Sequence, residues 1–320
     1  MIKITFMGAG STVFLRNVLG DCIYTDALKG MEIALYDIDG QRLEQSAAIL
    51  EAINKGNGCP ASIRSYLGAE NRRKALSGAD FVINAIQVGG YDPCTITDFE
   101  IPKKYGLRQT IGDTLGIGGI MRALRTIPVL EDFARDMEAV CPNAWFLNYT
   151  NPMSMLTGYM LRYTGVKTLG LCHSVQTCSK TLMDAIGMSD RLEGRRELIA
   201  GINHMGWLLD IRDRDGNDLY PEIRRRAKEK NASEKHHDMV RFDYIEKLGY
   251  YCTESSEHNA EFMPYFIRKN HPELIEKYQI PLDEYPRRCR IQIEHWKQLK
   301  NQLVGNEKLT HTRTHEYPSY

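Results

Sequence analysis

The sequence predicts an α/β protein built on a doubly wound parallel sheet, followed by a second, α+β domain. Three observations support this fold class. A strand pattern, a glycine turn and a helical pattern follow one another at the N-terminus, short apolar strands alternate with helical segments up to about residue 170, and the pattern changes after about residue 174. Alternating strands and helices are typical of a parallel sheet covered by helices. We therefore expect two domains, at residues 1–174 and 175–320.

The expected strands are short apolar runs, at residues 2–7, 31–36, 61–66, 80–87, 144–148 and 166–171. Apolar residues at helical spacing predict helices at 13–28, 41–54 and 121–141. The run 80–87 is almost continuously apolar, which is typical of a strand buried on both faces. Charged helical segments follow at 177–186, 223–230, 273–278 and 289–303. Asp215 and Gly216 predict the turn of a hairpin over 207–219.

Composition and charge argue against several classes of protein. The 320 residues hold 41 Lys plus Arg and 41 Asp plus Glu, so no charged field favours nucleic acid or an anionic membrane. No stretch approaches the roughly 18 to 20 apolar residues of a membrane helix. The first residues lack the long apolar region of a secretory signal, and eight irregularly spaced cysteines do not indicate a disulfide framework. We expect a cytoplasmic protein with neither nucleic acid nor membrane as partner.

A glycine turn follows the first predicted strand. Gly8 and Gly10 leave room for a pyrophosphate at a helix N-terminus, although Val13 replaces the third glycine of the G-x-G-x-x-G pattern. Asp37 ends the second strand, where a carboxylate can bind ribose hydroxyls and repel a 2′-phosphate, so NAD is favoured over NADP. The candidate cofactor-binding residues are Gly8, Gly10, Ser11, Thr12 and Asp37.

A second group of polar residues follows later strands. Asn148 ends the predicted strand 144–148, and Asn151 follows it. Cys172 comes after the strand 166–171, and His204 lies some thirty residues further on. A thiolate and an imidazole at the ligand-binding edge of a sheet can share a divalent metal that keeps positions open for substrate oxygens. Taken singly, Cys172 also fits a small buried apolar residue, and His204 fits a core histidine with its hydrogen bonds satisfied.

These motifs together resemble glycoside hydrolase family 4, the NAD- and metal-dependent glycosidases. The resemblance rests on motifs in the correct order: GAGST (8–12), DTLGIGG (113–119), NYTNP (148–152), LCHS (171–174) and GINH (201–204). Further runs are similar to the melibiase-type α-galactosidases of this family: GGY (89–91), TDFE (97–100), IMRALRTIP (120–128), TESSEH (253–258) and PLDEYP (281–286). The resemblance extends from residue 2 to about residue 303.

The resemblance implies a fold like that of lactate and malate dehydrogenases and a glycosidase that uses redox chemistry. NAD⁺ would take a hydride from C3 of the sugar, a base would remove the C2 proton, and the aglycone would leave by elimination. Water would then add, and the hydride would return. A divalent metal, Mn²⁺ in the usual case, would polarise the sugar oxygens at C2 and C3. The implied substrate is an α-glycoside such as melibiose.

The resemblance also implies roles for particular residues. Cys172 and His204 match the metal ligands, and Asn151 matches a substrate-binding asparagine, with Asn148 and Asp113 as further polar candidates around the sugar. His173 is the candidate for the leaving-group proton. For the C2 base the alternatives are Glu261 and Tyr265, in a segment that also fits an ordinary amphipathic helix. Asp113 alternatively fits a loop cap.

Other assignments stay open at this stage. Relatives acting on α-galacturonides or α-glucosides are alternatives within the family. An NAD-dependent hydroxy-acid dehydrogenase and an inactive NAD-binding or regulatory protein are alternatives outside this activity. Family members are typically homodimers or homotetramers, and they continue past the region that matches 315–317, so we expect this chain to be short at its C-terminus.

Overall fold

The structure is a computed structural model that describes residues 1–304, apart from the side chains of Thr12, His295 and residues 297–304. The chain divides into two compact units. Unit 1 contains residues 1–90, 122–171 and the described residues from 288 onward, and unit 2 contains Tyr91–Met121 and Cys172–Arg287. The predicted boundary at residue 174 lies near the break between Leu171 and Cys172. The prediction divided the chain at one position only, so it did not place the segment 91–121 in the second unit.

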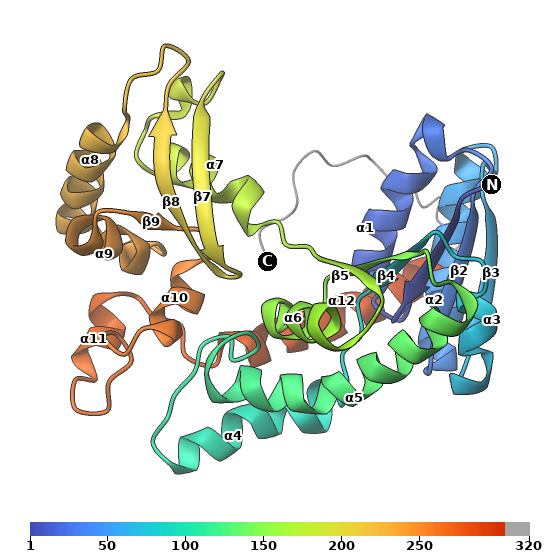
Figure 1. The fold of residues 1–320 in the computed structure, drawn as a ribbon. Helices are drawn as coiled ribbons and strands as arrows, with labels where there is room; N and C mark the ends of the chain where they lie inside the picture. The colour runs from blue at the N-terminus through green and yellow to red at the C-terminus, as the bar shows by residue number, and fades with distance from the viewer. Residues whose placement is uncertain (305–320) are drawn as a thin grey trace. The chain divides into compact units, whose positions relative to one another are not determined.

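A six-stranded parallel sheet forms the centre of unit 1 (Figure 1). The strands are β1 (Lys3–Met7), β2 (Glu32–Asp37), β3 (Ser62–Leu67), β4 (Phe81–Asn84), β5 (Trp145–Asn148) and β6 (Lys167–Gly170). Their order is β3-β2-β1-β4-β5-β6, so the direction of winding reverses between β1 and β4. The predicted doubly wound sheet is confirmed. Strand β4 ends earlier than predicted because its neighbour β1 ends at Met7, whose carbonyl accepts the N–H of Ala85.

Helices cover both faces of this sheet, as a doubly wound fold requires. They are α1 (Thr12–Ile23), α2 (Gly40–Gly56), α3 (Arg72–Leu76), α5 (Gly116–Val140) and α6 (Met153–Tyr163). On one face Phe6 and Leu35 pack with apolar residues of α1 and α2. On the other face Met7 and Phe146 pack with residues of α3, α5 and α6. Successive side chains of β1 therefore enter two different cores, as strand geometry dictates.

Unit 2 is built on a small antiparallel sheet (Figure 1). It contains β7 (Arg196–Ile202), β8 (Met205–Arg212) and β9 (Tyr251–Cys252). Its helices are α4 (Ile96–Lys104), α7 (Ser174–Ala185), α8 (Tyr220–Ser233), α9 (Met239–Leu248), α10 (Ser256–Phe262) and α11 (Glu273–Lys277). The division between the units falls within α5 and within α12 (Glu284–Val304).

The predicted hairpin over 207–219 differs from the structure. The main hairpin joins β7 to β8 and turns at Asn203 and His204, so β8 pairs along its length with the preceding strand. The turn predicted at Asp215 and Gly216 is present, because Gly216 donates to the Asp213 carbonyl at 3.0 Å, but only one bridge, between Arg212 and Asp218, extends it. The sequence identified a local turn and missed the longer pairing, whose strand 196–202 is largely exposed and carries little apolar signal.

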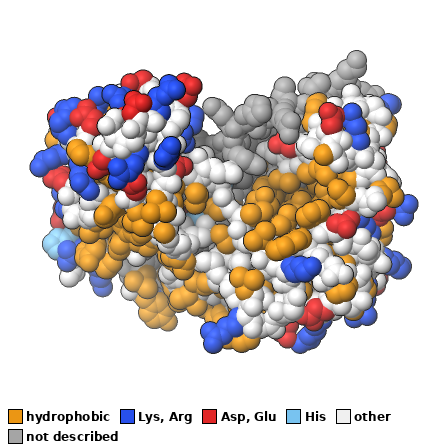
Figure 2. Space-filling model, turned by 45° about the horizontal axis from the view of Figure 1, so that its top comes forward, with side chains coloured by type: hydrophobic (Ala, Val, Ile, Leu, Met, Phe, Trp, Pro, Cys, Tyr) orange, Lys and Arg blue, Asp and Glu red, His pale blue; other side chains and the backbone are white. Residues whose placement is uncertain are grey.

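Two further apolar clusters hold unit 2 together. One lies between β8 and helices α7, α8 and α9, and the other surrounds Tyr244 and Phe266. No helix within residues 1–304 is both long and apolar enough to cross a bilayer. On the face drawn in Figure 2, basic and acidic side chains alternate and no large area of one sign is visible. This distribution agrees with the net charge of zero.

Candidate functional site

The glycine turn of unit 1, residues 8–12, has the geometry predicted for a nucleotide-binding turn. Gly8 has φ of +86°, and a Cβ atom there would lie 2.7 Å from the Ala85 carbonyl oxygen, so only glycine fits. Ser11 donates its N–H to the Gly8 carbonyl at 3.0 Å and makes no side-chain cap to the helix. Helix α1 begins at Thr12, whose side chain lies outside the described part. Uncapped N–H groups at this helix start can bind an anionic group.

Asp37 meets the glycine turn. One carboxylate oxygen accepts the Gly10 N–H at 2.6 Å, and the other accepts the Asp39 N–H at 2.9 Å. The carboxylate at the end of β2 therefore bonds directly to the turn, a contact that the sequence did not predict. Asp37 shapes the turn as well as standing where a ribose hydroxyl is expected.

The two predicted asparagines of unit 1 differ in their surroundings. Asn148 is completely buried at the end of β5, where its side chain bonds to Asn84 at 2.9 Å and to Thr157 at 3.2 Å. These contacts account for Asn148 without a ligand, and its contact with substrate stays a prediction. Asn151 is partly exposed, and its carbonyl accepts from Arg122 at 3.1 Å.

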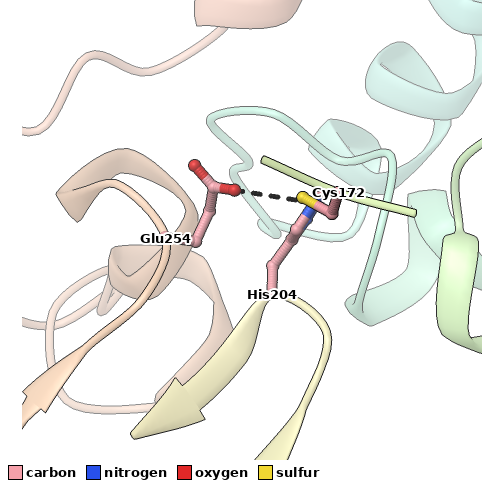
Figure 3. A group of neighbouring side chains, drawn as sticks. All are labelled: Cys172, His204 and Glu254. Carbon is pink, nitrogen blue, oxygen red and sulfur yellow. Dashed lines mark ion pairs between the residues drawn. The ribbon is translucent and has the colours of Figure 1, made fainter. Parts of the chain in front are cut away.

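Unit 2 brings together three side chains that can hold a metal, Cys172, His204 and Glu254, here called the metal cluster (Figure 3). Cys172 lies just before α7, His204 lies at the turn between β7 and β8, and Glu254 follows β9. One potential ligand atom of each lies within 4.8 Å of the others, and the figure shows the three side chains pointing toward one another. The structure thus brings the predicted Cys172 and His204 together.

Glu254 is the member of the cluster that the sequence did not reveal. It follows a strand that contains only Tyr251 and Cys252, which pair with Leu208 and Trp207 of β8. A two-residue strand carries almost no periodic signal. The available signal was chemical: a carboxylate lies in the run TESSEH, which already carried the resemblance.

Charge couples the three groups. Burial of Cys172 opposes ionisation, but a hydrogen bond and the charge of His204 lower the pKa of the thiol below its ordinary value. Burial likewise opposes ionisation of His204 and Glu254. Nevertheless, the contacts with Cys172 and Glu254 raise the pKa of His204 to about 9, and the charges of His258 and His204 lower the pKa of Glu254 to about 2.

These shifts describe a pocket that attracts positive charge. The contacts with Cys172 and Glu254 favour a proton on His204, whose Nε2 lies 3.5 Å from Glu254 Oε2. A divalent cation can take the place of that proton, because metal ligation requires a thiolate, a carboxylate and a neutral imidazole. Sulfur, nitrogen and oxygen donors together suit a first-row transition ion, so the residues fit a metal.

A loop from the segment 91–121 adjoins the metal cluster. The Thr114 hydroxyl lies 3.0 Å from His204 Nδ1 and donates to Asp113 Oδ1 at 2.7 Å. Asp113 is 5% exposed, and Thr114 is fully buried. His258 stacks edge-on against His204 with ring centroids 5.1 Å apart, and its Nδ1 lies 2.9 Å from the Ser255 hydroxyl.

The remaining predicted residues lie around this centre in different ways. His173 follows Cys172 at the start of α7, and burial lowers the pKa of its imidazole. Tyr265 is 65% exposed. Glu261 is held by backbone N–H groups, because one oxygen accepts from Thr110 at 2.7 Å and Ile111 at 3.2 Å, and the other accepts from Gly112 at 2.8 Å. Burial outweighs these bonds and raises the pKa of Glu261 to about 7.

Comparison with known proteins covers both halves of the chain. The family description "Family 4 glycosyl hydrolase" matches residues 3–188, and the description of its C-terminal domain matches residues 199–320. An α-galactosidase of Bacillus subtilis is 63% identical over 319 residues, which are 100% of this chain and 72% of that relative. An α-galacturonidase of Thermoanaerobacter italicus is 31% identical over 324 residues, covering 96% of this chain and 69% of that relative.

A solved structure has the same fold. A 6-phospho-α-glucosidase from gut microorganisms, in complex with NAD and Mn²⁺, has a TM-score of 0.73 at 19% identity. The match covers 98% of this chain and 72% of that one.

Proposed function

Since the chain belongs to the family 4 glycosyl hydrolases, we propose that it hydrolyses α-galactosides such as melibiose, with NAD and a divalent metal as cofactors. The observation that carries the proposal is the metal cluster of Cys172, His204 and Glu254. An ordinary hydroxy-acid dehydrogenase has no use for such a group. The 63% identity to an α-galactosidase along the whole chain supports the choice of sugar.

Different residues of the chain would bind the two cofactors. The glycine turn would hold the phosphates of NAD, and Asp37 would hold a ribose hydroxyl. Cys172, His204 and Glu254 would hold the metal, for which Mn²⁺ is our first choice. When bound, NAD supplies a reversible oxidation of the sugar, and the metal supplies a Lewis acid for its oxygens. Asn151 and Asp113 are proposed to contact the substrate.

Proton transfer is assigned to side chains of unit 2. We propose that His173, next to Cys172, protonates the oxygen of the leaving group. For removal of the C2 proton the candidates remain Glu261 and Tyr265. The raised pKa of Glu261 suits a base near neutral pH. Its three backbone contacts favour a second role for Glu261, which is to hold the loop before Asp113.

The proposal is tested by the cofactor requirements of p-nitrophenyl α-galactoside hydrolysis. We expect activity only with both NAD⁺ and Mn²⁺, no net build-up of NADH, and deuterium from heavy water at C2 of the product. Hydrolysis without NAD⁺, or product lacking deuterium at C2, would refute the redox route. Steady formation of NADH from a hydroxy acid would identify a dehydrogenase instead.

The same assay discriminates between sugars and bases. Faster cleavage of α-galacturonides or α-glucosides would show that one of those sugars, and not an α-galactoside, is the preferred substrate. Glu261→Gln and Tyr265→Phe should be compared for exchange of the C2 proton, because only loss of the base abolishes exchange while NAD still binds. Cys172→Ser should abolish the stimulation of hydrolysis by Mn²⁺. Cys141→Ser, which changes a buried cysteine of unit 1, is the matched control.

We also propose a cytoplasmic homodimer or homotetramer. The eight cysteines, all within the described residues, are free thiols, and Cys172 must stay reduced to bind a metal. Light scattering of the purified chain measures its oligomeric state directly. A monomer that retains full activity would remove this part of the proposal.

A further inference from the structure

We propose that Asp113 and Thr114 form a hydrogen-bond relay that fixes the tautomer and orientation of His204, so that its ring presents Nε2 to the metal cluster. This inference deepens the proposed function and rests on it. Thr114 is then a positioning residue, because it acts on the metal through His204. The relay also gives a role to Thr114, the second residue of the DTLGIGG motif, to which the proposed activity assigns none.

The three groups form an unbroken chain of short contacts. Asp113 Oδ1 lies 2.7 Å from the Thr114 hydroxyl, and that hydroxyl lies 3.0 Å from His204 Nδ1. All three side chains are almost completely shielded from solvent. In a buried position each hydrogen bond must be satisfied within the protein, so the direction of each bond is constrained.

Counting protons fixes these directions. A carboxylate can only accept, so the single hydroxyl proton of Thr114 points to Asp113. The Thr114 oxygen can then only accept from His204, which places a proton on Nδ1. A neutral imidazole with its proton on Nδ1 carries its lone pair on Nε2. Nε2 is the atom that lies 3.5 Å from Glu254, on the side of the metal cluster.

The relay is anchored on both sides of Thr114. On one side Glu261 accepts three backbone N–H groups from Thr110, Ile111 and Gly112, and this fixes the chain entering Asp113. On the other side the start of α5 packs so closely that a Cβ at Gly119 would lie 2.6 Å from the Thr114 carbonyl. The hydroxyl is thus held at His204 by backbone packing as well as by its own hydrogen bonds.

Metal binding by the whole chain, without NAD or sugar, tests the relay. Thr114→Val keeps the shape and removes the hydroxyl, and we expect it to weaken Mn²⁺ binding about 10- to 100-fold in calorimetric titrations, as loss of a hydrogen-bond partner behind a metal ligand does. Thr114→Ser should retain the affinity. Thr126→Val removes another buried hydroxyl, bonded to the Arg122 carbonyl, and should leave Mn²⁺ binding unchanged. Unchanged Mn²⁺ affinity in folded Thr114→Val would overturn the relay.

A second measurement reads the tautomer directly and stands even if Thr114→Val fails to fold. In ¹⁵N-histidine spectra of the metal-free wild-type chain, recorded at a pH above which the His204 signals no longer change, we expect the His204 proton on Nδ1. A proton on Nε2 would refute the relay. If the wild-type chain binds no Mn²⁺ and hydrolyses no α-galactoside, the proposed function fails, while this spectrum still decides the relay.

Discussion

The glycine turn of unit 1 and the metal cluster of unit 2 are constructed in different ways. The turn is one short run of residues shaped by backbone geometry, and the carboxylate of Asp37 accepts the N–H of its Gly10. The metal cluster draws Cys172, His204 and Glu254 from three separate segments and couples them by charge. Steric fit governs the first site, and buried electrostatics govern the second.

A buried ion pair behind the metal cluster illustrates the difference. Arg241 bonds to Asp238 at 2.5 Å, and both side chains are 5% exposed or less. The same guanidinium donates to the carbonyls of Cys252 and Thr253, directly before Glu254. Unit 1 has a looser counterpart, in which Arg72 and Arg73 share Asp136 and Arg73 is 64% exposed. Loss of a single charged side chain should therefore lower the free energy of unfolding more in unit 2 than in unit 1.

The largest effect is expected for Arg241→Met. The substitution leaves Asp238 buried without its cation, which costs about 3 to 5 kcal/mol in the free energy of unfolding. Mn²⁺ binding should weaken as well, because the backbone before Glu254 loses two hydrogen bonds. Urea unfolding followed by circular dichroism measures the first effect, and calorimetry with Mn²⁺ measures the second.

Arg73→Met is the matched control in unit 1. Arg72 still pairs with Asp136, and the lost Arg73 side chain is 64% exposed, so the free energy of unfolding should fall by less than about 1 kcal/mol. If Arg241→Met and Arg73→Met lowered the free energy of unfolding equally, the contrast between the units would be wrong. Asp238→Asn combined with Arg241→Met should recover part of the stability, because no charge is then left unpaired.

The next largest effect is steric and belongs to unit 1. Gly8→Ala places a side chain at φ of +86° and brings its Cβ to 2.7 Å from the Ala85 carbonyl. The strain and the overlap should cost about 2 to 4 kcal/mol. NAD binding, followed by protein fluorescence, should fall sharply while Mn²⁺ binding persists. Gly216→Ala is the control, since its positive φ faces open space. NAD affinity that survives Gly8→Ala would remove this turn from the cofactor site.

The same contrast explains what the sequence could predict. The doubly wound sheet, the glycine turn and Asp37 follow from short-range patterns, because a strand, a turn and a helix occupy consecutive residues. Cys172 and His204 were identified by motif resemblance, and only the fold brings them together. Glu254 lies after a two-residue strand, and Thr114 reaches His204 from a segment ninety residues earlier, so neither contact leaves a periodic trace.

A third prediction concerns pH and Glu261. Burial raises the pKa of its carboxyl from 4.5 to about 7 in the folded chain. Between these values the folded state keeps a proton that the unfolded chain has lost, so stability falls as pH rises. This contribution is complete below about pH 4.5 and is lost as pH rises through about 7, with an amplitude of about 1 to 3 kcal/mol.

Glu261→Gln isolates this contribution. The variant cannot ionise, so the free energy of unfolding of wild type relative to the variant should decline between about pH 5 and 7. The variant should also be less stable overall, because its amide nitrogen cannot accept the backbone N–H groups of Thr110 or Gly112. Urea unfolding across this range provides the curve. A difference that stays constant with pH would mean that Glu261 is ionised throughout.

The smallest effect is expected for Asp37→Asn, which tests how far the glycine turn depends on charge. The amide oxygen can replace only one of the two carboxylate oxygens that accept from Gly10 and Asp39, so one of these two charged hydrogen bonds is lost and the other becomes neutral. We expect NAD⁺ to bind about fivefold more weakly, equivalent to about 1 kcal/mol. NADP⁺ should lose less or gain, because the repulsion of its 2′-phosphate disappears. Parallel titrations with the two nucleotides measure the ratio of affinities, and Asp39→Asn, which caps α2 outside the turn, is the control. If the ratio is unchanged in Asp37→Asn, the carboxylate serves only to shape the turn, and backbone geometry alone accounts for the cofactor site of unit 1.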